Sequence, residues 1–460
     1  MRQPRTDRGR VLLVLVLAAA VAVFTATVPL LRDWFDLRVY YGAVNGWVHH
    51  GGRIYDYRVP GTDYGFTYPP FAAVGMLPMA LVGLRTAIVL SFLLNLAALA
   101  LVVHIVTEGA WRRYGWYGCA LGACLLALFE PIRDTFSFGQ VNLLLLGLVL
   151  WDAWLLRTGR GNRAGVGIGL AAAIKLTPGL FIGLLLLARR RRAAAIATAA
   201  AAAATALAAW VDPGASRFYW TVALWDTSRV GRLDYVSNQS LQGILARLGI
   251  EGRPVWGLAV LLVLGVWAVR TRRAVAAGDW TAAFALTGLA ACLVSPITWV
   301  HHLVWLLPAF AVLIRTGHPR IAGALYAVLC TSVVWLWFHD ASGIDGFLGS
   351  NTYTWITLGL LLWLPAGQLR PDRTPLTRPP LNWPPLARST SATPTAPTAA
   401  APATAQVSAQ PGPSSGATAT ATGWTSGPGL GLTRSASSEP TGSTRPAAAN
   451  PQSSSSRASS

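Results

Sequence analysis

The stretch GVGIGLAAAIKLTPGLFIGLLLLARRRR, residues 165–192, decides the kind of fold that this sequence adopts. It is apolar except for Lys175 and the terminal arginines, and Pro178 interrupts it near the middle. Arginines also precede it at 157–163, and basic residues that flank membrane segments gather on the cytoplasmic side. We therefore expect the chain to enter the membrane here and return. Each half is about 10 residues, or roughly 15 Å as a helix, so we predict two short helices that meet near Lys175, a break tolerated where the backbone lines a cavity.

The composition of the whole chain agrees with a membrane protein. Of 460 residues, 53% are hydrophobic and only 12% are charged, and the mean hydropathy is +0.46. A soluble domain carries about twice that charged fraction, so a water-soluble globule of this length could not cover its surface. The formal net charge of +19 would suggest nucleic-acid binding in a soluble protein. In a membrane protein it records orientation instead, and no nucleic-acid partner is expected.

Further apolar runs of roughly 17–25 residues predict spanning helices. The first follows a basic N-terminus, is too long for a signal peptide and lacks a small-residue cleavage site after it, so we interpret it as a retained signal anchor. The run at 69–84 is interpreted as a short helix on the outer surface, because a span there would invert every later loop. With the two halves of 165–188, the prediction is about twelve membrane segments. The other predicted spans are 11–31, 86–106, 116–130, 138–156, 193–211, 254–270, 280–296, 302–315, 321–338 and 352–369.

The charges separate by side on this topology. The segments predicted to be cytoplasmic hold 25 basic and 6 acidic residues, and the external segments hold 12 of each. The basic clusters guided the assignment, but the neutral balance outside did not, and it supports the topology. We expect a multi-pass plasma-membrane protein with both termini in the cytoplasm. The expected parts are a basic N-terminus (1–10), a membrane core (11–369) and a disordered cytoplasmic tail (370–460) rich in Pro, Ser, Thr and Ala.

Polar residues near the predicted spans are functional candidates, since such residues are costly in a bilayer. Here they come from segments across the chain and gather at the predicted outer face. A transporter would place them near the bilayer midplane, so this clustering indicates an active site that is open to the outside. The candidates are Asp33, Asp36, Arg133, Asp134, Gln140, Asn142, Lys175, Asn238, Gln239, Ser240, Ser295, Trp299, His301 and His302.

Asp36 opens the stretch DLRVYYGAVNGWVHHG, whose apolar residues repeat at helical spacing. This pattern predicts a short amphipathic helix on the membrane surface. The Asp36 carboxylate then has two interpretations that spacing alone leaves open. It could cap the N-terminus of that helix, or it could act as a general base just outside the bilayer.

Lys175 is the only lysine among 37 basic residues. A sequence that otherwise uses arginine keeps a compact ammonium here, which suits a phosphate oxygen or a tight pocket better than a planar guanidinium does. The alternative is a chance survivor that snorkels to the membrane interface.

The remaining candidates also have two interpretations each. His301 and His302 are adjacent, so on a helix they point about 100° apart and cannot readily ligate one metal. They fit interfacial hydrogen bonding, or binding of a phosphate or a sugar hydroxyl. Gln140 and Asn142 fit helix–helix hydrogen bonds or sugar hydroxyls. The aromatic residues fit an interfacial belt or stacking on a sugar face; they are Tyr64, Phe66, Tyr68, Trp299 and Trp305.

Neither a metal site nor a disulfide framework is expected. All four cysteines lie in apolar stretches, and no cysteine or carboxylate accompanies the two histidines at metal-ligand spacing.

Taken in order, several stretches resemble the actinobacterial polyprenol-phosphate-mannose-dependent α-(1→2)-mannosyltransferases of glycosyltransferase family 87. The resemblance covers about residues 30–370. The matching stretches are DLRVYYGAV (36–44), GGRIYDY (51–57), FTYPPFAAV (66–74), SFGQVNLLLLGLVLWDAWLL (137–156), GIGLAAAIKLTPGLF (167–181), NQSLQG (238–243) and SPITWVHHLVWLLP (295–308).

The resemblance implies a GT-C fold, an all-α polytopic membrane bundle with short surface helices and a catalytic carboxylate in the first external loop. It also implies inverting transfer of mannose from polyprenyl-phosphate-mannose to a cell-envelope glycolipid or glycan, without a metal or other cofactor. Asp36 occupies the position of the general base, with Asp33 as second choice. The expected donor-phosphate ligands are Lys175, His301 and His302, with Arg38 or Arg133 in reserve, and the expected sugar or acceptor ligands are Gln140, Asn142, Asn238, Tyr68 and Trp299.

Three alternatives remain open on the sequence. The donor could be decaprenyl-phospho-arabinose, which would make the protein an arabinofuranosyltransferase. The chain could instead be a non-catalytic envelope-lipid transporter, which predicts charges at the bilayer midplane; Asp152 and His104 are the nearest examples. It could also be a membrane-embedded assembly protein whose tail recruits cytoplasmic partners.

Overall fold

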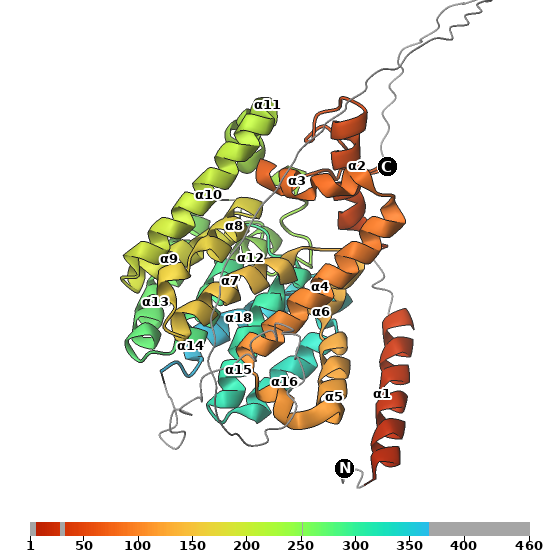
Figure 1. Ribbon diagram of the computed structural model, residues 1–460, viewed down its shortest axis with the longest axis vertical. Coiled ribbons are helices and arrows are strands. Elements are labelled where there is room, and N and C mark those ends of the chain that lie inside the picture. The colour runs from red at the N-terminus through yellow and green to blue at the C-terminus, as the bar shows by residue number, and fades with distance from the viewer. Residues whose placement is uncertain (1–5, 28–32, 251, 368–460) are drawn as a thin grey trace, which may run out of the picture. The chain divides into compact units, whose positions relative to one another are not determined.

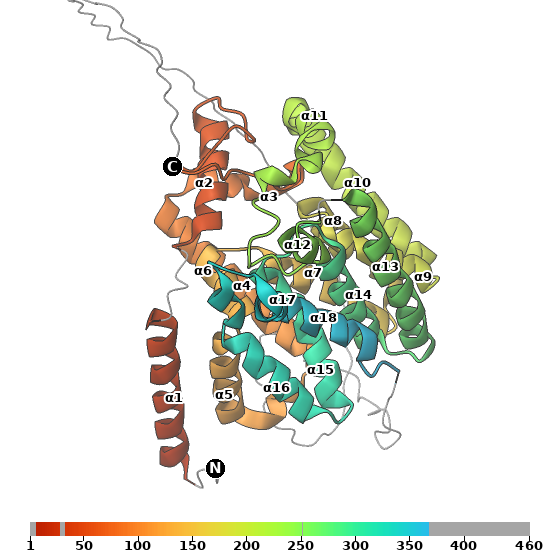
Figure 2. The same cartoon turned by 180° about the vertical axis from the view of Figure 1, so that it is seen from behind.

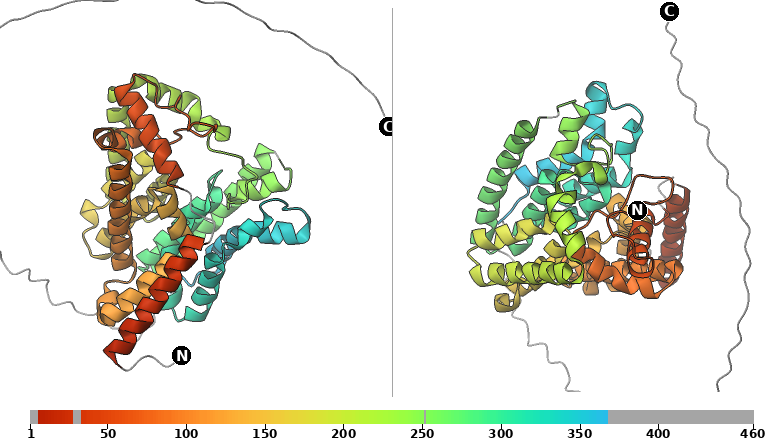
Figure 3. Two further views of the ribbon diagram at one scale, coloured as in Figure 1. Left: turned by 90° about the vertical axis from the view of Figure 1, so that its right-hand side faces the viewer. Right: turned by 90° about the horizontal axis from the view of Figure 1, so that it is seen from above.

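The computed structural model describes residues 6–27, 33–250 and 252–367, and every regular element within those ranges is a helix (Figure 1). Figure 3 shows the same helical arrangement from the side and from above. One isolated antiparallel bridge joins Arg58 and Gly65. The all-α prediction is therefore confirmed for these ranges. The predicted tail at 370–460 and residues 1–5 lie outside them.

Four helices are long and apolar enough to cross a membrane, or up to five if the pair α5–α6, bent by 74°, forms one broken span. Helices of 21–24 residues reach about 32–36 Å, which matches a hydrocarbon core of about 30 Å. The four are α1 (Asp7–Thr27), α4 (Leu84–Val106), α10 (Arg191–Val211) and α13 (Arg253–Ala276), and the bent pair is α5 (Gly115–Leu128) with α6 (Glu130–Phe138).

The other predicted spans also form helices, but shorter ones. Proline lies in the first turn of two of these helices, α15 and α16, where its missing N–H is tolerated and where it separates each helix from the preceding one. The number of twelve spanning segments is therefore not confirmed among the described residues. These helices are α7 (Asn142–Arg157), α14 (Trp280–Val294), η7 (Val300–Leu306), α15 (Leu307–Arg315), α16 (Pro319–Cys330), η8 (Val333–Trp337) and α18 (Thr352–Trp363).

The break in 165–188 lies where the sequence predicts it. Helix α8 (Val166–Ile174) ends directly before Lys175, which is extended at φ −148° and ψ 130°. A turn of 3₁₀-helix, η4 (Thr177–Gly179), contains Pro178 and leads into α9 (Leu180–Leu187). Lys175 thus lies in an interruption between two short helices.

The loop predicted to be external forms the helices α2 (Phe35–His49), α3 (Pro70–Met76) and η1 (Leu77–Leu81), where the sequence predicts short surface helices. Figures 1 and 2 show α2 and α3 at the end of the described core away from α5 and α16. Trp34 is the N-cap of α2 and makes no side-chain capping bond, while Asp36 lies within the first turn. The interpretation of Asp36 as an N-cap is therefore wrong, because the chain enters the helix two residues earlier.

The described core is centred on α14, in which almost every residue is buried. It packs against α7, α9, α13, α15, α18 and η7. The remaining short helices lie in connections: η2 (Ala110–Tyr114), η3 (Gly161–Arg163), α11 (Pro213–Thr221), η5 (Ala223–Trp225), η6 (Thr227–Arg229), α12 (Leu241–Arg247) and α17 (Gly343–Ser350).

Helix α8 is held between α7 and α10 by glycines. A Cβ atom built on Gly165 or Gly169 would lie 2.3 Å from a backbone oxygen of α10, and one on Gly167 would lie 2.2 Å from a backbone oxygen of α7. Small residues at this spacing let membrane helices approach closely. This packing carries the C-terminal end of α8, and with it Lys175, into the core.

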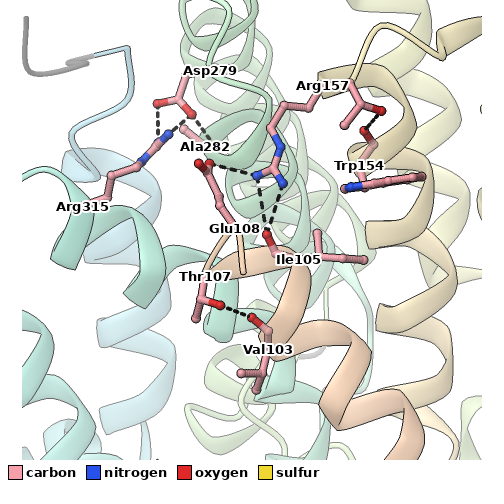
Figure 4. A network of polar contacts seen from close by, with 10 residues as sticks. Val103, Ile105, Thr107, Glu108, Trp154, Arg157, Asp279, Ala282 and Arg315 are labelled. Atoms are coloured by element: carbon pink, nitrogen blue, oxygen red, sulfur yellow. Dashed lines mark hydrogen bonds and ion pairs between the residues drawn. The ribbon is translucent and has the colours of Figure 1, made fainter. Parts of the chain in front are cut away.

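Carboxylates that cap helices or pair with arginine complete the packing. Asp152 of α7 accepts a hydrogen bond of 2.8 Å from the backbone N–H of Ile168 and so caps α8. Asp279 caps α14 and forms an ion pair with Arg315 at 2.7 Å (Figure 4). Figure 4 also shows Arg157 with the carboxylate of Glu108, at 2.9 Å. These contacts are structural, because those of Asp152 and Asp279 each join two helices and that of Glu108 joins α7 to the turn after α4.

Candidate active site

The candidate site is built around Asp36, on the first turn of α2. Its Oδ2 accepts a hydrogen bond of 2.6 Å from Nε2 of Gln140, in the link between α6 and α7. Gly139 makes this approach possible: it has φ 68°, and a Cβ there would lie 2.6 Å from Cβ of Leu37. Oδ1 of Asp36 has no hydrogen-bond partner among the described residues. One carboxylate oxygen is thus held, and the other is free for a substrate.

Two tyrosines extend this contact into a directed chain. The Tyr68 hydroxyl donates to Oε1 of Gln140 at 2.8 Å and accepts from the Tyr40 hydroxyl at 3.0 Å. Burial raises the pKa of Tyr68, so its hydroxyl stays protonated and can donate. Donation runs from Tyr40 through Tyr68 and Gln140 to Asp36. The chain therefore orients the Gln140 amide with its N–H toward the carboxylate.

Lys175 lies on the other side of this chain. Its Nζ is 3.1 Å from Oδ1 of Asn142, 3.4 Å from the Tyr68 hydroxyl and 2.6 Å from Nε2 of His302. Nζ also lies 5.0 Å from the centre of the Tyr68 ring, within cation–π distance. Nζ of Lys175, in the interruption between α8 and α9, thus contacts one residue each from the loop before α3, from α7 and from η7.

The hydrogen bonds of His302 indicate which of its ring nitrogens carries the hydrogen that lies between His302 and Lys175. The backbone N–H of Trp299 donates to Nδ1 of His302 at 3.0 Å, so Nδ1 carries no hydrogen. The neutral ring then carries its hydrogen on Nε2, which faces Nζ of Lys175. A lone pair on Nζ must accept that hydrogen, which leaves two N–H groups for Asn142 and Tyr68. The hydrogen-bond directions therefore match an uncharged amine at Lys175.

A small cavity of about 10 Å³ lies behind this pair. It is too small for a sugar ring and has room for about one water molecule. Its lining residues are Asn142, Leu145, Lys175, Thr177, Pro178, Cys292, Thr298, His302 and Trp305.

The environment of Asp36 suits a general base. The side chain is half-buried, and loss of hydration raises the pKa of Asp36 to about 6. The hydrogen bond from Gln140 and, when it is charged, Lys175 act in the opposite direction. A base whose pKa lies near the working pH is ionised and still a useful proton acceptor.

Three other predicted site residues lie at or beyond the edge of this cluster. His301 is buried, with its ring edge-on to Phe138 at 5.2 Å and to His302 at 4.7 Å. Trp299 packs edge-on to Tyr235, and its backbone orients His302. Asn238 is fully buried, and its amide group bonds to the backbone of Leu233, Pro296 and Thr298. The Asn238 side chain is therefore used in tying two loops together.

The reserve residues are engaged elsewhere. Arg38 forms an ion pair with the exposed Asp33 at 2.7 Å, and Arg133 donates to Ser332 at 2.8 Å. Sequence reasoning missed Tyr40, which lies one helical turn after Asp36 in the stretch DLRVYYGAV. That spacing of four residues was the available signal.

A proton-accepting carboxylate beside a group that can become cationic, at the edge of apolar helices, is what a membrane transferase of a lipid-linked anionic substrate requires. The chain belongs to glycosyltransferase family 87, whose sequence model matches residues 66–296. It is accordingly a glycosyltransferase, and its apolar helices identify it as a membrane protein.

Several characterised relatives carry mannosyltransferase names. A polyprenol-phosphate-mannose-dependent α-(1-2)-phosphatidylinositol mannoside mannosyltransferase of Mycobacterium tuberculosis is 36% identical over 66% of this chain and 72% of its own length. Its counterpart in Mycolicibacterium smegmatis is 34% identical over 63% of this chain and 68% of its own length. A phosphatidylinositol pentamannoside mannosyltransferase of M. tuberculosis is 31% identical over 80% of this chain and 90% of its own length. No solved structure matches the chain.

Proposed function

We propose that this chain moves mannose from polyprenyl-phosphate-mannose to a hydroxyl group of a cell-envelope glycolipid or glycan, with inversion and formation of an α-(1→2) linkage. The names of the relatives support the donor, the linkage and a phosphatidylinositol mannoside as the kind of acceptor. The single observation that carries the chemistry is the Asp36 carboxylate, with Oδ2 held by Gln140 and Oδ1 free.

In the proposed step, the acceptor hydroxyl donates its proton to Oδ1 of Asp36 while its oxygen attacks C1 of the mannose. The bond from C1 to the phosphate oxygen breaks, and its electron pair leaves with the polyprenyl phosphate. A single displacement converts the β-linked donor into an α-linked product. The carboxylate also lies near the positive charge that develops at C1 in such a transition state.

The leaving phosphate gains one negative charge in this step. Charge-assisted hydrogen bonds are roughly twice as strong as neutral ones, so a protonated Lys175 and the Nε2–H of His302 would stabilise it. Nζ and Nε2 are 2.6 Å apart, so both could reach one phosphate group. His301, Trp299 and Asn238 are proposed to act less directly, through the loops that carry His302. Asn142, Gln140 and Tyr68 remain the proposed groups closest to the sugar hydroxyls.

We also propose the GT-C arrangement with about twelve membrane segments, an active site on the extracytoplasmic face and both termini in the cytoplasm. The surface helices α2 and α3 and the interrupted segment at Lys175 support it, together with the neutral balance of external charge. The proposed parts stay as predicted: an N-terminus at 1–10, a core at 11–369 and a cytoplasmic tail at 370–460.

The transporter alternative has less support. The two ionisable residues nearest to the predicted midplane both have structural partners: Asp152 caps α8, and Nδ1 of His104 accepts a hydrogen bond of 3.2 Å from Trp111. Neither lines a path that the described residues outline. No observation favours arabinose over mannose as the donor sugar.

The test is transfer of labelled mannose from polyprenyl-phosphate-mannose to a phosphatidylinositol mannoside by the full chain in lipid nanodiscs. We expect Asp36→Asn to lower kcat/KM by about 10² to 10⁴, the range for loss of a general base. Asp33→Asn is the matched control, because Asp33 is exposed and Asn tolerates its positive φ of 48°. Full transfer by Asp36→Asn would exclude Asp36 as the base. Transfer from decaprenyl-phospho-arabinose but not from polyprenyl-phosphate-mannose would make arabinose, and not mannose, the donor sugar.

A further inference from the structure

An apolar groove with a basic end runs between α9 and α13, away from Asp36. The two helices lie side by side in Figures 1 and 2 and contact each other. The groove has a volume of about 800 Å³. Its walls are Gly183, Leu186, Leu187, Ala188, Trp267, Val275 and Ala276, and its end is formed by Arg189 and Arg272.

The floor of this groove is rigid. Trp267 is 7% exposed, and its Nε1–H donates to Thr287 at 3.0 Å, so the indole ring is held in place. Gly183 lies over it, and a Cβ there would come within 3.3 Å of the ring. The groove is open at this point because α9 carries no side chain there. Leu186, 59% exposed, forms part of its outer wall.

The basic end has no acid to balance it. No carboxylate lines the groove, and the nearby Asp279 is already paired with Arg315. Arg189 and Arg272 are exposed, and their guanidinium groups have no ion-pair or hydrogen-bond partner among the residues that the structure describes. By contrast, Arg270, two residues before Arg272 on α13, donates to the carbonyls of Leu361 and Leu364. Two guanidinium groups are thus available at the mouth of an apolar channel.

From this arrangement we propose that the groove binds an anionic phospholipid, with an acyl chain between α9 and α13 and the phosphate between Arg189 and Arg272. Helix α13 is long and apolar enough to cross a membrane, and α9 belongs to the predicted membrane core, so we expect lipid rather than water around the groove. Basic pockets between membrane helices favour anionic headgroups, and a guanidinium can hold two phosphate oxygens at once. A zwitterionic headgroup would bring a positive amine to a site without a carboxylate.

The polyprenyl donor is a different ligand at a different place. Its phosphate is proposed at Lys175, which precedes α9, whereas Arg189 follows the C-terminal end of the same helix. Eight residues of helix separate the two ends by about 12 Å. A phospholipid in the groove would therefore brace α9 against α13 without occupying the transfer site.

The test is lipid retention by the full chain, purified in detergent and incubated with equal amounts of phosphatidylglycerol and phosphatidylcholine, with bound lipids identified by native mass spectrometry. We expect phosphatidylglycerol to be retained about tenfold in preference, a difference of about 1.4 kcal/mol, because its headgroup is anionic and the mouth of the groove carries two arginines. The double variant Arg189→Gln/Arg272→Gln should lose this preference. Ala276→Trp, at an exposed position of the wall, should lower retention of both lipids without changing charge.

The matched control is Arg192→Gln/Arg320→Gln, which removes the same charge at exposed positions outside the groove. This variant should keep the wild-type preference. An equal loss of the phosphatidylglycerol preference in both double variants would show that general surface charge causes it and would overturn the proposal. An unchanged preference in both double variants would overturn it as well. Displacement of phosphatidylglycerol by polyprenyl phosphate would also overturn it, because the groove would then belong to the donor. A thermal melt of each variant separates loss of binding from loss of folding.

Discussion

At the scale of single side chains, the hydration of Asp36 controls when this carboxylate can accept a proton. Burial raises its pKa to about 6, and the Gln140 N–H opposes that shift by stabilising the ionised form. Tyr68 keeps the amide in the orientation that donates. The pH range in which Asp36 can act as the proposed base therefore depends on Gln140, which does not itself react.

This balance predicts the pH dependence of transfer. Only the ionised carboxylate can accept the acceptor's proton, so kcat/KM should fall as the pH is lowered through about 6. Gln140→Leu removes a donor that stabilises the charge, so the pKa of Asp36 should rise and the acid limb should move to higher pH. A pH–rate profile measures this shift. Asn45→Leu on the same helix is the control, since that side chain bonds only to the carbonyl of Tyr41; an identical profile for wild type and Gln140→Leu would contradict the argument.

Donor binding should be coupled to uptake of a proton by Lys175. The hydrogen-bond directions match an uncharged amine facing Nε2–H of His302, and a phosphate diester beside it favours the ammonium. The other titratable groups that face Nζ are Asp36, Tyr68 and Cys292. The Asp36→Asn variant removes the titration of that carboxylate. In this variant the donor Kd should weaken as the pH rises, by up to about tenfold per pH unit.

Lys175→Arg in the same Asp36→Asn background provides the comparison, because guanidinium stays charged over this range. The donor Kd of this double variant should be nearly independent of pH. Isothermal titration in buffers of different ionisation enthalpy would count the protons taken up. A donor Kd that does not change with pH in the chain that retains Lys175 would mean that the lysine is already charged before the donor binds.

At the scale of helices, the position of Lys175 depends on how closely α8 packs against α10. Gly169 leaves no room for a side chain, since a Cβ there would lie 2.3 Å from the carbonyl oxygen of Ala197 and 2.7 Å from Cβ of Ala200. We expect Gly169→Leu to lower the free energy of unfolding by at least about 1–3 kcal/mol, the usual cost of overpacking, and to impair transfer as well. Thermal unfolding in one detergent measures the first effect.

Gly257 of α13 offers a control for this substitution. It is also a helical glycine, but a Cβ there would meet no atom within 4 Å. Gly257→Leu should leave the unfolding temperature unchanged or raise it slightly, because leucine has the higher helix propensity. Equal destabilisation by the two variants would show that the close α8–α10 contact is not what matters.

At the scale of the whole molecule, the distribution of charge predicts sidedness. The loop between α2 and α3 is predicted to be outside, and the loop between α7 and α8 inside. Asp63→Cys and Asn162→Cys place a thiol at an exposed position of each loop, in a background without the four native cysteines. A membrane-impermeant maleimide applied to intact cells should label Cys at position 63 and should label Cys at position 162 only after permeabilisation. The reverse pattern would invert the proposed topology.

Much of the helical framework follows from the sequence because it rests on local signals. The interruption at Lys175 is predictable from Pro178 and from basic residues at both ends of 165–192, and the structure confirms it. The helix after Asp36 is predictable from apolar spacing. The boundaries of the helices were less predictable. Helix α7 begins four residues after its predicted start, because Gly139 ends α6 in a left-handed conformation.

The sequence by itself determined that this is an apolar, all-helical chain with one lysine at a break and a carboxylate at the start of a surface helix. These features depend on residues close together in the chain. Only the tertiary structure decided that Gln140 holds Asp36, that Tyr40 and Tyr68 orient Gln140, and that His302 faces Lys175. Most of these partners lie 72 to 127 residues apart in the sequence. No local pattern encodes such contacts, because they form only when the close packing of several helices brings distant loops to one point.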